Sequence, residues 1–541
     1  MNFGQRLKTL LYIFNLNSRK LASAIHVDPS SVSRWINNKR TLPPNTLIVD
    51  KIVDFILNID SLDYQKHQFF QLISPNSDIA VMNSIQHAKK LKEWLFTPAK
   101  SSHIEGKATA QNDDNKLNEI QIKELLINIK EYTSKPNDAF ASVSFNKLDD
   151  VIVNTGVKKT LEVFHGKEGI HQSMLRLAIS LLQENQPGEI LITCQDNFIW
   201  FKETEFMTLW MDLMSEILKK GHRIKIIYNL AHGLPEVMYL IQKWLPLLTT
   251  GNLDAFYYPK YELDLISTTI IVVPGIGCVH SILSEDESTH GSTFLYTDYG
   301  ITEYFKNKYN KLIFSAKKLV YTFSSSNILS LHEEISMIEQ NPGCRFVFRN
   351  GLTSLTLPLP LYKTLLEKSN LTKSQQQKRL SLQKLRLEIM KSKERSAIYR
   401  DICPLEALEE MTNNKHYEYC LIDIFSSGVV KAEPSNMIEH LKNTIEMLIH
   451  NDNYEIAFVS ANEIFGENTM YLALKEDTAA LVSSWDIEGN PLCLLIKENM
   501  VVHAFEEYFK RTWEQIPRVN RDKNWVIRKL QTKITQLENS I

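Results

Sequence analysis

Near the amino terminus, ten polar side chains have the chemistry needed to contact a nucleic acid. Serine hydroxyls, asparagine amides and an arginine guanidinium can hydrogen-bond to base edges in the major groove. Lysine and arginine at the margins of such a set can hold phosphates. The candidate base contacts are Arg34, Ser30 and Ser33, with Ser31 and Asn37 close by. The candidate phosphate contacts are Lys39, Arg40, Arg19 and Lys20, and Asn38 lies between the two groups.

Two short helices are predicted to position these side chains. Leu21, Ala22 and Ile25 have the spacing expected for the buried face of the first helix. The sequence Asp-Pro-Ser at 28–30 then ends that helix. The aspartate or the serine can cap the next helix, whose first position tolerates proline.

The second helix is predicted to bury one face and to expose the other. Val32, Trp35 and Ile36 fall at the spacing i, i+3, i+4, which indicates a single apolar stripe. Arg34 and the serines would lie on the opposite face. A further amphipathic helix is predicted over residues 3–14, and its apolar stripe would complete a small all-helical core.

This segment resembles the DNA-binding domain of phage repressors and Cro proteins (XRE type). The second motif helix of that family commonly reads small-x-Val/Ile-Ser-x-Trp-x-x-Gly-Lys/Arg, and residues 31–40 of this chain read SVSRWINNKR. Asn38 stands where the family usually has glycine, and asparagine is the next best residue at a left-handed helix exit. The resemblance covers residues 1–60 and implies a helix-turn-helix head that binds double-stranded DNA.

Charge is distributed unevenly along the chain. Residues 1–44 hold seven lysines and arginines against the single acid Asp28, a net charge of +6. The whole chain has a net charge of −2, which leaves −8 for the remainder. A basic head on an acidic body confines the expected polyanion contact to the head.

Length and composition predict several domains of an ordinary soluble protein. A chain of 541 residues exceeds what one core usually organises. No long apolar run predicts a membrane span, and the first residues do not resemble a signal peptide. The six cysteines are scattered without a CxxC pair, which suits a reducing cytoplasm and predicts no metal site and no cofactor.

Beyond the head, alternating helical and strand patterns predict an α/β body. The expected organisation is a head at 1–60, a helical extension at 61–96, a linker at 97–116, a first α/β lobe at 117–325, a connector with a long polar helix at 326–398, and a second, shorter α/β lobe at 399–541.

Two internal echoes suggest that the lobes are related. The sequence at 170–193 matches 439–460 in its order of amphipathic helix, polar break and apolar strand. Leu295, Asp298, Ile301, Phe305 and Tyr309 match Leu495, Glu498, Val501, Phe505 and Phe509 at a constant offset of 200. Two copies of one ancestral unit would explain both echoes.

This layout is similar to that of the phospholipase D-like superfamily, in which two α/β lobes pack together. Its repeated cue is a strand, then a helix that begins with an acid and ends near a tryptophan, as in ENMVVHAFEEYFKRTW at 498–513. Some sugar-responsive transcription regulators of the TrmB type carry a related lobe. The resemblance covers roughly 150–325 and 400–520 and implies two phospholipase D-like lobes.

The catalytic signature of that superfamily is incomplete in this chain. Active members need a histidine nucleophile, a lysine two residues on and an aspartate five residues after the lysine. Three His-x-Lys triplets occur, at 87–89, 165–167 and 440–442. The aspartate positions hold Trp94, Gln172 and Met447. We therefore expect catalytically inactive lobes and no enzymatic activity.

The sequence thus predicts a cytoplasmic, sequence-specific, DNA-binding transcriptional regulator. A homodimer on a two-half-site operator is expected, because one such head buries little surface on DNA. The body would supply dimerisation, sensing of a small-molecule or peptide effector, or both. The alternatives are a phospholipase D-like nuclease or phosphodiesterase, possibly in phage defence, a peptide-pheromone-responsive regulator with a helical-repeat body, and a structural adaptor.

Overall fold

The structure is a computed structural model, and the chain forms two compact units. One comprises residues 1–116 with 229–231 and 258–267, and the other comprises 117–228, 232–257 and 268–541. The described residues are 3–14, 16, 18–36, 46–59, 84–96, 105–134, 160–194, 204–228, 234–258, 267–283, 291–341, 343–391, 397–413, 417–419, 430–460, 470–485 and 491–540.

The amino-terminal unit is built from short helices around one apolar core. The helices are α1 Phe3–Ile13, α2 Ser18–Ala24, α3 Pro29–Ile36, α4 Leu47–Leu57 and α6 Ser84–Phe96. The first three follow the stripes predicted from the sequence. The core joins α1, α2 and α3 to α4 and α6, and its largest buried side chain is that of Trp35. Burial of these apolar stripes stabilises helices that are too short to persist alone.

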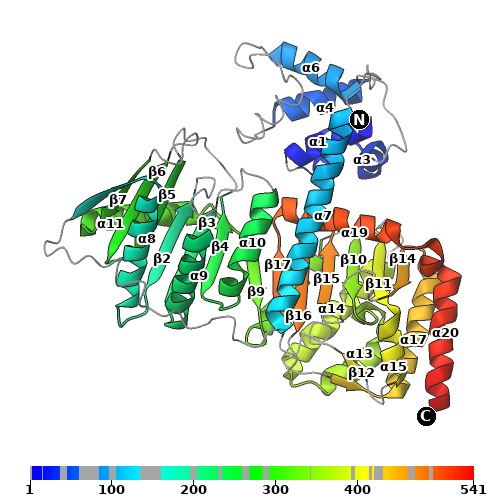
Figure 1. The fold of residues 1–541 in the computed structure, drawn as a ribbon. Coiled ribbons are helices and arrows are strands. Elements are labelled where there is room, and N and C mark those ends of the chain that lie inside the picture. The colour runs from blue at the N-terminus through cyan, green and yellow to red at the C-terminus, as the bar shows by residue number, and fades with distance from the viewer. Residues whose placement is uncertain are drawn as a thin grey trace. The chain divides into compact units, whose positions relative to one another are not determined.

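The first lobe of the second unit is an eight-stranded mixed sheet between helices (Figure 1). Its strand order is β1-β7-β6-β5-β2-β3-β4-β8. The strands are β1 Leu161–His165, β2 Glu189–Cys194, β3 Arg223–Tyr228, β4 Leu253–Tyr257, β5 Ser267–Val273, β6 Gly277–Leu283, β7 Gly291–Tyr296 and β8 Lys317–Lys318. The helices are α7 Glu105–Ser134, α8 Gly166–Leu182, α9 Thr204–Lys219, α10 Leu234–Leu248 and α11 Tyr299–Ile313.

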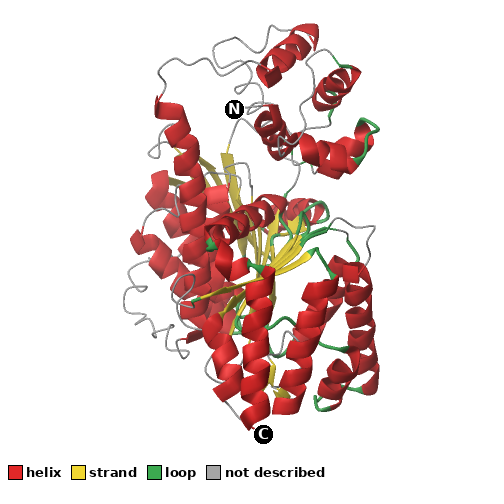
Figure 2. Cartoon of the chain, turned by 90° about the vertical axis from the view of Figure 1, so that its right-hand side faces the viewer, coloured by secondary structure: helices red, strands yellow, loops and turns green. Residues whose placement is uncertain are grey.

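The second lobe contains a seven-stranded mixed sheet in the order β14-β11-β10-β15-β16-β17-β9. Its strands are β9 Val320–Phe323, β10 Arg345–Arg349, β11 Tyr399–Pro404, β14 Tyr454–Val459, β15 Met470–Lys475, β16 Ala479–Trp485 and β17 Pro491–Ile496, and β12 Tyr417–Tyr419 pairs with β13 Val430–Ala432 in a separate ribbon. The helices are α12 Ile328–Glu339, α13 Leu359–Glu367, α14 Lys373–Lys391, α15 Leu405–Asn413, α17 Pro434–His450, α19 Asn499–Gln515 and α20 Lys523–Ser540. Figure 2 shows strands enclosed by helices.

The two sheets share one topology. In the first, β2 pairs in parallel with β3 and antiparallel with β5, and the edge strand β1 pairs antiparallel with β7. In the second, β10 pairs in parallel with β11 and antiparallel with β15, and the edge strand β9 pairs antiparallel with β17. Apart from the additional edge strand β8 of the first sheet, the same strand order occurs in both lobes, which agrees with a duplicated unit.

Of the two sequence echoes, only the one with an offset of 200 joins equivalent elements. It aligns β7 and α11 with β17 and α19. In both places an acid caps the helix, since Asp298 accepts a hydrogen bond from the Ile301 amide and Glu498 from the Val501 amide, each at 2.9 Å. The echo between 170–193 and 439–460 is wrong. It aligns α8 and β2 of the first lobe with α17 and β14 of the second, whereas the counterparts of α17 and β14 in the first lobe are α10 and β4. The two sequences look alike because any amphipathic helix followed by a buried strand has this pattern of polarity.

The lobes are joined directly. Strand β8 pairs with β4 of the first sheet and β9 with β17 of the second, and only Leu319 separates β8 from β9. Helix α7 also contacts both lobes. The Gln242 amide donates to the Gln121 carbonyl at 3.1 Å, and the Thr133 and Ser484 hydroxyls lie 2.7 Å apart. The two sheets therefore belong to one body.

Two segments differ from their expected roles. Helix α7 begins at Glu105, inside the predicted linker 97–116, of which 97–104 lie outside the described residues. The expected connector 326–398 supplies α12, the central strand β10, α13 and α14 to the second lobe. The short strand RFVFR begins and ends with arginine and so lacks the apolar run typical of a central strand.

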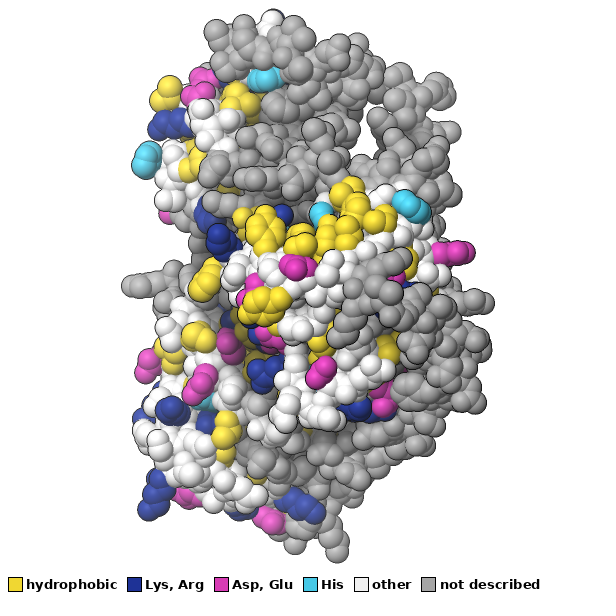
Figure 3. Space-filling view, turned by 90° about the vertical axis from the view of Figure 1, so that its left-hand side faces the viewer, with side chains coloured by type: hydrophobic (Ala, Val, Ile, Leu, Met, Phe, Trp, Pro, Cys, Tyr) yellow, Lys and Arg dark blue, Asp and Glu magenta, His cyan; other side chains and the backbone are white. Residues whose placement is uncertain are grey.

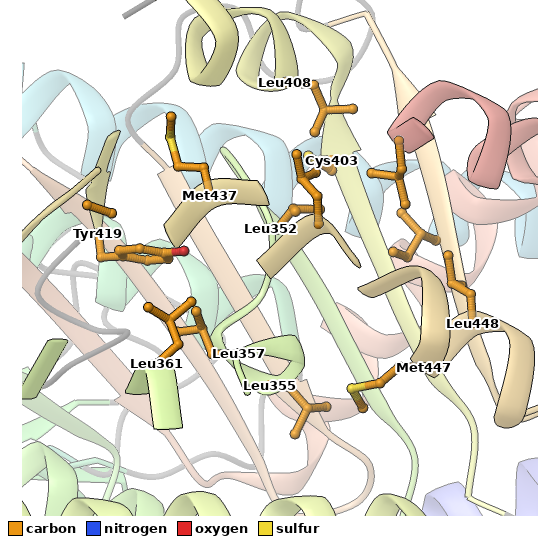
Figure 4. Packing of buried hydrophobic residues seen from close by; sticks show 14 of the residues in the cluster. Leu352, Leu355, Leu357, Leu361, Cys403, Leu408, Tyr419, Met437, Met447 and Leu448 are labelled. Atoms are coloured by element: carbon orange, nitrogen blue, oxygen red, sulfur yellow. The ribbon is translucent and has the colours of Figure 1, made fainter. Parts of the chain in front are cut away.

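The core of the second lobe lies between its sheet and the helices α13, α17 and α20 (Figure 4). Leucine, methionine and tyrosine side chains from distant segments meet there, including Leu352, Leu361, Tyr419 and Met437. At the far edge of the first lobe, apolar side chains gather on the surface instead (Figure 3). Leu161 and Val163 of the edge strand β1 and Tyr304 of α11 are among the exposed apolar residues there.

Candidate functional site

The turn between α2 and α3 has a specific geometry. Helix α2 ends in a Schellman motif, in which the Val27 amide donates to the Ala22 carbonyl at 2.9 Å and the His26 amide to the Ser23 carbonyl at 3.3 Å. His26 takes the left-handed conformation that this motif requires, with φ of 55°. The Ser31 amide then donates to the Asp28 carbonyl at 2.9 Å, which starts α3. Four residues, 25–28, separate the two helices. This length matches the connection of three to four residues that is typical of a helix-turn-helix.

Helix α3 buries the predicted face and exposes Arg34. Val32 and Trp35 are 0% and 2% exposed and pack in the helical core. Arg34 is exposed, Ser31 is half-buried, and Lys20 on α2 is exposed. The side chains of Arg19, Ser30 and Ser33, and the whole of Asn37, Asn38, Lys39 and Arg40, lie outside the described residues.

Helix α6 packs onto the same core, and charged side chains of α1, α4 and α6 take part in this contact. Arg6 of α1 donates to the Trp94 carbonyl, and its guanidinium lies 5.5 Å from the centre of the Trp94 ring. Burial lowers the pKa of Arg6. Lys92 of α6 forms an ion pair with Asp50 of α4. Arg6 therefore belongs to the internal packing of this unit, whereas Arg34 and Lys20 project from it.

The three His-x-Lys triplets lie on separate elements. His87 is on α6, and His165 ends β1, where the side chain of Lys167 lies outside the described residues. His440 lies within α17 and is fully buried. Its Nε2 is 2.8 Å from the Thr356 hydroxyl, and its Nδ1 is 2.7 Å from the Tyr419 hydroxyl. Each triplet thus lies on its own element, and both ring nitrogens of His440 are held by hydrogen-bond partners inside the second lobe.

The second lobe also contains a cluster of buried charged side chains, which we did not predict from the sequence. The Glu339 carboxylate of α12 accepts hydrogen bonds from Arg345 of β10 and from Arg386 of α14, the latter at 2.9 and 3.0 Å. The Lys475 ammonium of β15 lies 3.9 Å from the same carboxylate and donates to the Gly343 carbonyl at 3.2 Å. Each of these four side chains is at most 8% exposed. We call these four residues the basic cluster.

The basic cluster borders a cavity of about 30 Å³, which is also lined by Ser354, Tyr471 and apolar side chains. Burial alone would raise the pKa of Glu339, but the neighbouring Arg345, Arg386 and Lys475 outweigh it and bring that pKa down to about 2. Burial lowers the pKa of Lys475, and the two arginines lower it further against the opposing effect of Glu339. Three cations therefore share one carboxylate.

Weak signals for this cluster exist in the sequence. Arginine occupies both ends of the otherwise apolar strand β10, and Arg379, Gln383 and Arg386 recur on one face of α14. The sequence predicted only a long polar helix in a connector, yet all three side chains are buried. Long polar side chains at helical spacing usually indicate a solvated face, so only the packing of α12 and the sheet against α14 reveals them.

Comparison with known proteins gives only distant likenesses. The sequence matches no protein-family model and no curated protein. Similar solved structures include TrmBL2, an archaeal chromatin protein (16% identity, 58% of this chain and 99% of that chain, TM-score 0.23). Others are NucT from Helicobacter pylori (11%, 29% and 98%, 0.22) and the phospholipase D family member Nuc from Salmonella typhimurium (11%, 29% and 96%, 0.22). All of these TM-scores are well below 0.5.

Two further properties concern the described residues alone. No helix among them combines the length and apolarity needed to cross a bilayer. Within the same residues, no three histidine, cysteine, aspartate or glutamate side chains gather as metal ligands would.

Proposed function

We propose that this chain is a DNA-binding transcriptional regulator in which α2 and α3 form a helix-turn-helix. The observation that carries the proposal is the geometry of α3, which follows a four-residue turn, buries Val32 and Trp35 and presents Arg34 outward. A helix held in this way can enter the major groove, with Arg34 reaching a guanine edge. Lys20 and the predicted Arg19, Lys39 and Arg40 would hold the flanking phosphates.

The body would dimerise the protein and sense an effector. A homodimer places two α3 helices on two half-sites, which raises both affinity and specificity. The exposed apolar residues Leu161 and Val163 lie on an edge strand, and their register with Tyr296 and Phe294 places all four on one face of the sheet. Phe294 and Tyr296 are half-buried, and Tyr296 stacks on Phe305 of α11, so the exposed part of this face is Leu161 and Val163. Exposed apolar side chains on an edge strand are typical of an interaction surface, and we propose them as the dimer contact.

We propose no catalytic role for the body. Support comes from the incomplete catalytic signature at each His-x-Lys triplet and from the buried hydrogen bonds that occupy both ring nitrogens of His440. A pheromone-receptor body made of helical repeats is also disfavoured, because two mixed sheets form the body. Incubation of the purified chain with single- and double-stranded DNA, with and without Mg²⁺ or Mn²⁺, should yield intact DNA, whereas metal-dependent cleavage would favour the nuclease alternative.

Selection of genomic fragments by the full-length protein, followed by gel shift, tests the DNA-binding proposal. Arg34→Ala should weaken binding to the selected operator by about 1–3 kcal/mol and relax specificity at one base pair. Lys39→Ala should weaken all sequences alike and reduce the salt slope by about one. Arg528→Ala, an exposed arginine on α20 of the body, is the matched control and should have no effect. If the natural chain ignores duplex DNA at low salt, or if Arg34→Ala and Arg528→Ala behave alike, the proposal is wrong.

A further inference from the structure

The two related lobes allow a direct comparison of equivalent edge strands, β1 in the first sheet and β9 in the second. Leu161 of β1 has the position of Val320 of β9, because their partners on β7 and β17 are 200 residues apart in the chain. Val320 is 1% exposed, whereas Leu161 is 44% exposed. The helices beside these strands differ in the same way, since Phe505 of α19 is fully buried and Phe305 of α11 is half-buried. The first lobe therefore exposes a surface whose counterpart in the second lobe is buried.

The first lobe supplies the cover over β9 and α19. Strand β9 follows β8, which pairs with β4 of the first sheet, and α10 of the first lobe packs against α19. The edge formed by β4 and α10 thus covers the surface of β9 and α19. In the second lobe the equivalent edge is formed by β14 and α17. A second chain that repeated the contact between the lobes would have to place this edge on β1.

The edge of β14 and α17 is already covered within its own chain. Helix α20 packs against both elements, and its Val526 and Leu530 side chains are fully buried in the core of the second lobe. The Asn520 side-chain amide, in the turn before α20, donates to the Phe458 carbonyl of β14 at 2.8 Å. A head-to-tail repeat of the contact between the lobes, which would lead to rings or open filaments of chains, is therefore blocked.

Strand β1 lacks the features that usually keep a free sheet edge from pairing. Such edges commonly carry lysine, proline or an inward-pointing charge. The sequence of β1 is LEVFH, and the carboxylate of its single acid, Glu162, forms an ion pair with Arg176 of α8 at 2.9 Å. Leu161 and Val163 alternate with Glu162 and so lie on the opposite face, where both are exposed. The edge is thus apolar on its exposed face and neutralised on the other, which favours pairing with a further strand.

We propose that β1 pairs with β1 of a second copy of this chain, antiparallel across a two-fold axis, so that the two first-lobe sheets become one continuous sheet. A two-fold axis perpendicular to the sheet makes two copies of one strand antiparallel and closes the assembly at two chains. The apolar side chains that gather at this edge (Figure 3), among them Leu161, Val163 and Tyr304, would then be covered by their counterparts. This inference rests on the homodimer of the proposed function and specifies its geometry.

Cysteine cross-linking of the full-length protein tests the pairing. If the two β1 strands pair over their whole length, the axis passes beside Val163, and the two copies of that residue lie opposite each other at a Cβ–Cβ distance of about 5 Å. Val163→Cys should therefore form a disulfide-linked dimer on mild oxidation. Ile449→Cys on α17 is the matched control, because Ile449 is 52% exposed and Val163 is 49% exposed. This control and the natural chain should give no cross-linked dimer.

A second variant tests the same contact without a cross-link. Leu161→Lys places on β1 the lysine that protects many sheet edges, and it should reduce the molar mass in light scattering from that of a dimer to that of a monomer. Leu329→Lys on α12, at a position of similar exposure, is the matched control and should stay dimeric. Circular dichroism first establishes that each variant is folded; if one β1 variant is not, the other decides.

The possible outcomes separate the pairing from the homodimer itself. A natural chain that is dimeric, but whose dimer survives Leu161→Lys or gives no cross-link in Val163→Cys, would overturn the β1 pairing and leave the homodimer intact. A monomeric natural chain would overturn both. DNA binding by the head is judged separately, by gel shift.

Discussion

Replacing Glu339 by glutamine should loosen the second lobe measurably, because this buried carboxylate is hydrogen-bonded to Arg345 and Arg386 and lies 3.9 Å from the Lys475 ammonium. Its pKa falls from an ordinary value of 4.5 to about 2 in the folded chain. One pKa unit corresponds to about 1.4 kcal/mol, so the ionised carboxylate stabilises the fold by about 3 kcal/mol at neutral pH. Removal of one partner from a buried ion pair costs a similar amount, about 3–5 kcal/mol.

Native-state hydrogen exchange measures this change locally, which matters in a chain of several domains. The amides of β10 and β15 should exchange about 100-fold faster in Glu339→Gln, since each factor of ten corresponds to about 1.4 kcal/mol. Amides of β2 and β3 in the first lobe should not change. The difference should be full above pH 4.5 and fade as the pH falls from 4.5 towards 2, because protonation of Glu339 in the natural chain then removes the same charge.

Glu367→Gln is the matched control. Glu367 pairs with Lys363 at 3.8 Å on α13, with both side chains more than half exposed. Exposed pairs of this kind contribute about 0–1 kcal/mol. If both variants leave the exchange of β10 and β15 equally protected at pH 7, the carboxylate of Glu339 does not hold the cluster and the reasoning fails.

Three further predictions concern other parts of the chain. Trp35→Ala should destabilise the amino-terminal helices by about 3–5 kcal/mol and expose α3 to limited proteolysis, whereas Leu47→Ala, at an exposed position, should not. Val163→Asp should convert the proposed dimer to a monomer in multi-angle light scattering, and a natural chain that is itself monomeric would refute the dimer. Burial raises the pKa of Asp401 to about 6 from 3.8, so its ionised form opposes folding. Asp401→Asn should therefore slow amide hydrogen exchange in β11 above pH 6, because it raises the free energy of opening by up to about 3 kcal/mol. Below pH 4 it should have no effect.

Local patterns of polarity allowed several elements to be predicted from the sequence. The helices α1, α2 and α3 lie where their patterns place them, and the helix and strand expected at 170–193 are α8 and β2. The reason is that each has one apolar face or run whose burial is the same in any compact arrangement. The constant offset of 200 likewise identified equivalent strand-helix pairs, because the acid caps at Asp298 and Glu498 are fixed by local geometry.

The second lobe and its basic cluster were decided by long-range packing. Strand β10 has arginine at both ends, and Phe346 stacks on Phe509 of α19 while α12 and α14 cover the opposite face. Which strands pair, and which polar side chains the pairing buries, depends on contacts between segments far apart in the chain. The sequence by itself therefore determined the helical head and the α/β character of the body. Only the tertiary structure decided that three cations and one carboxylate meet in its interior, since no local pattern distinguishes a buried arginine from a solvated one.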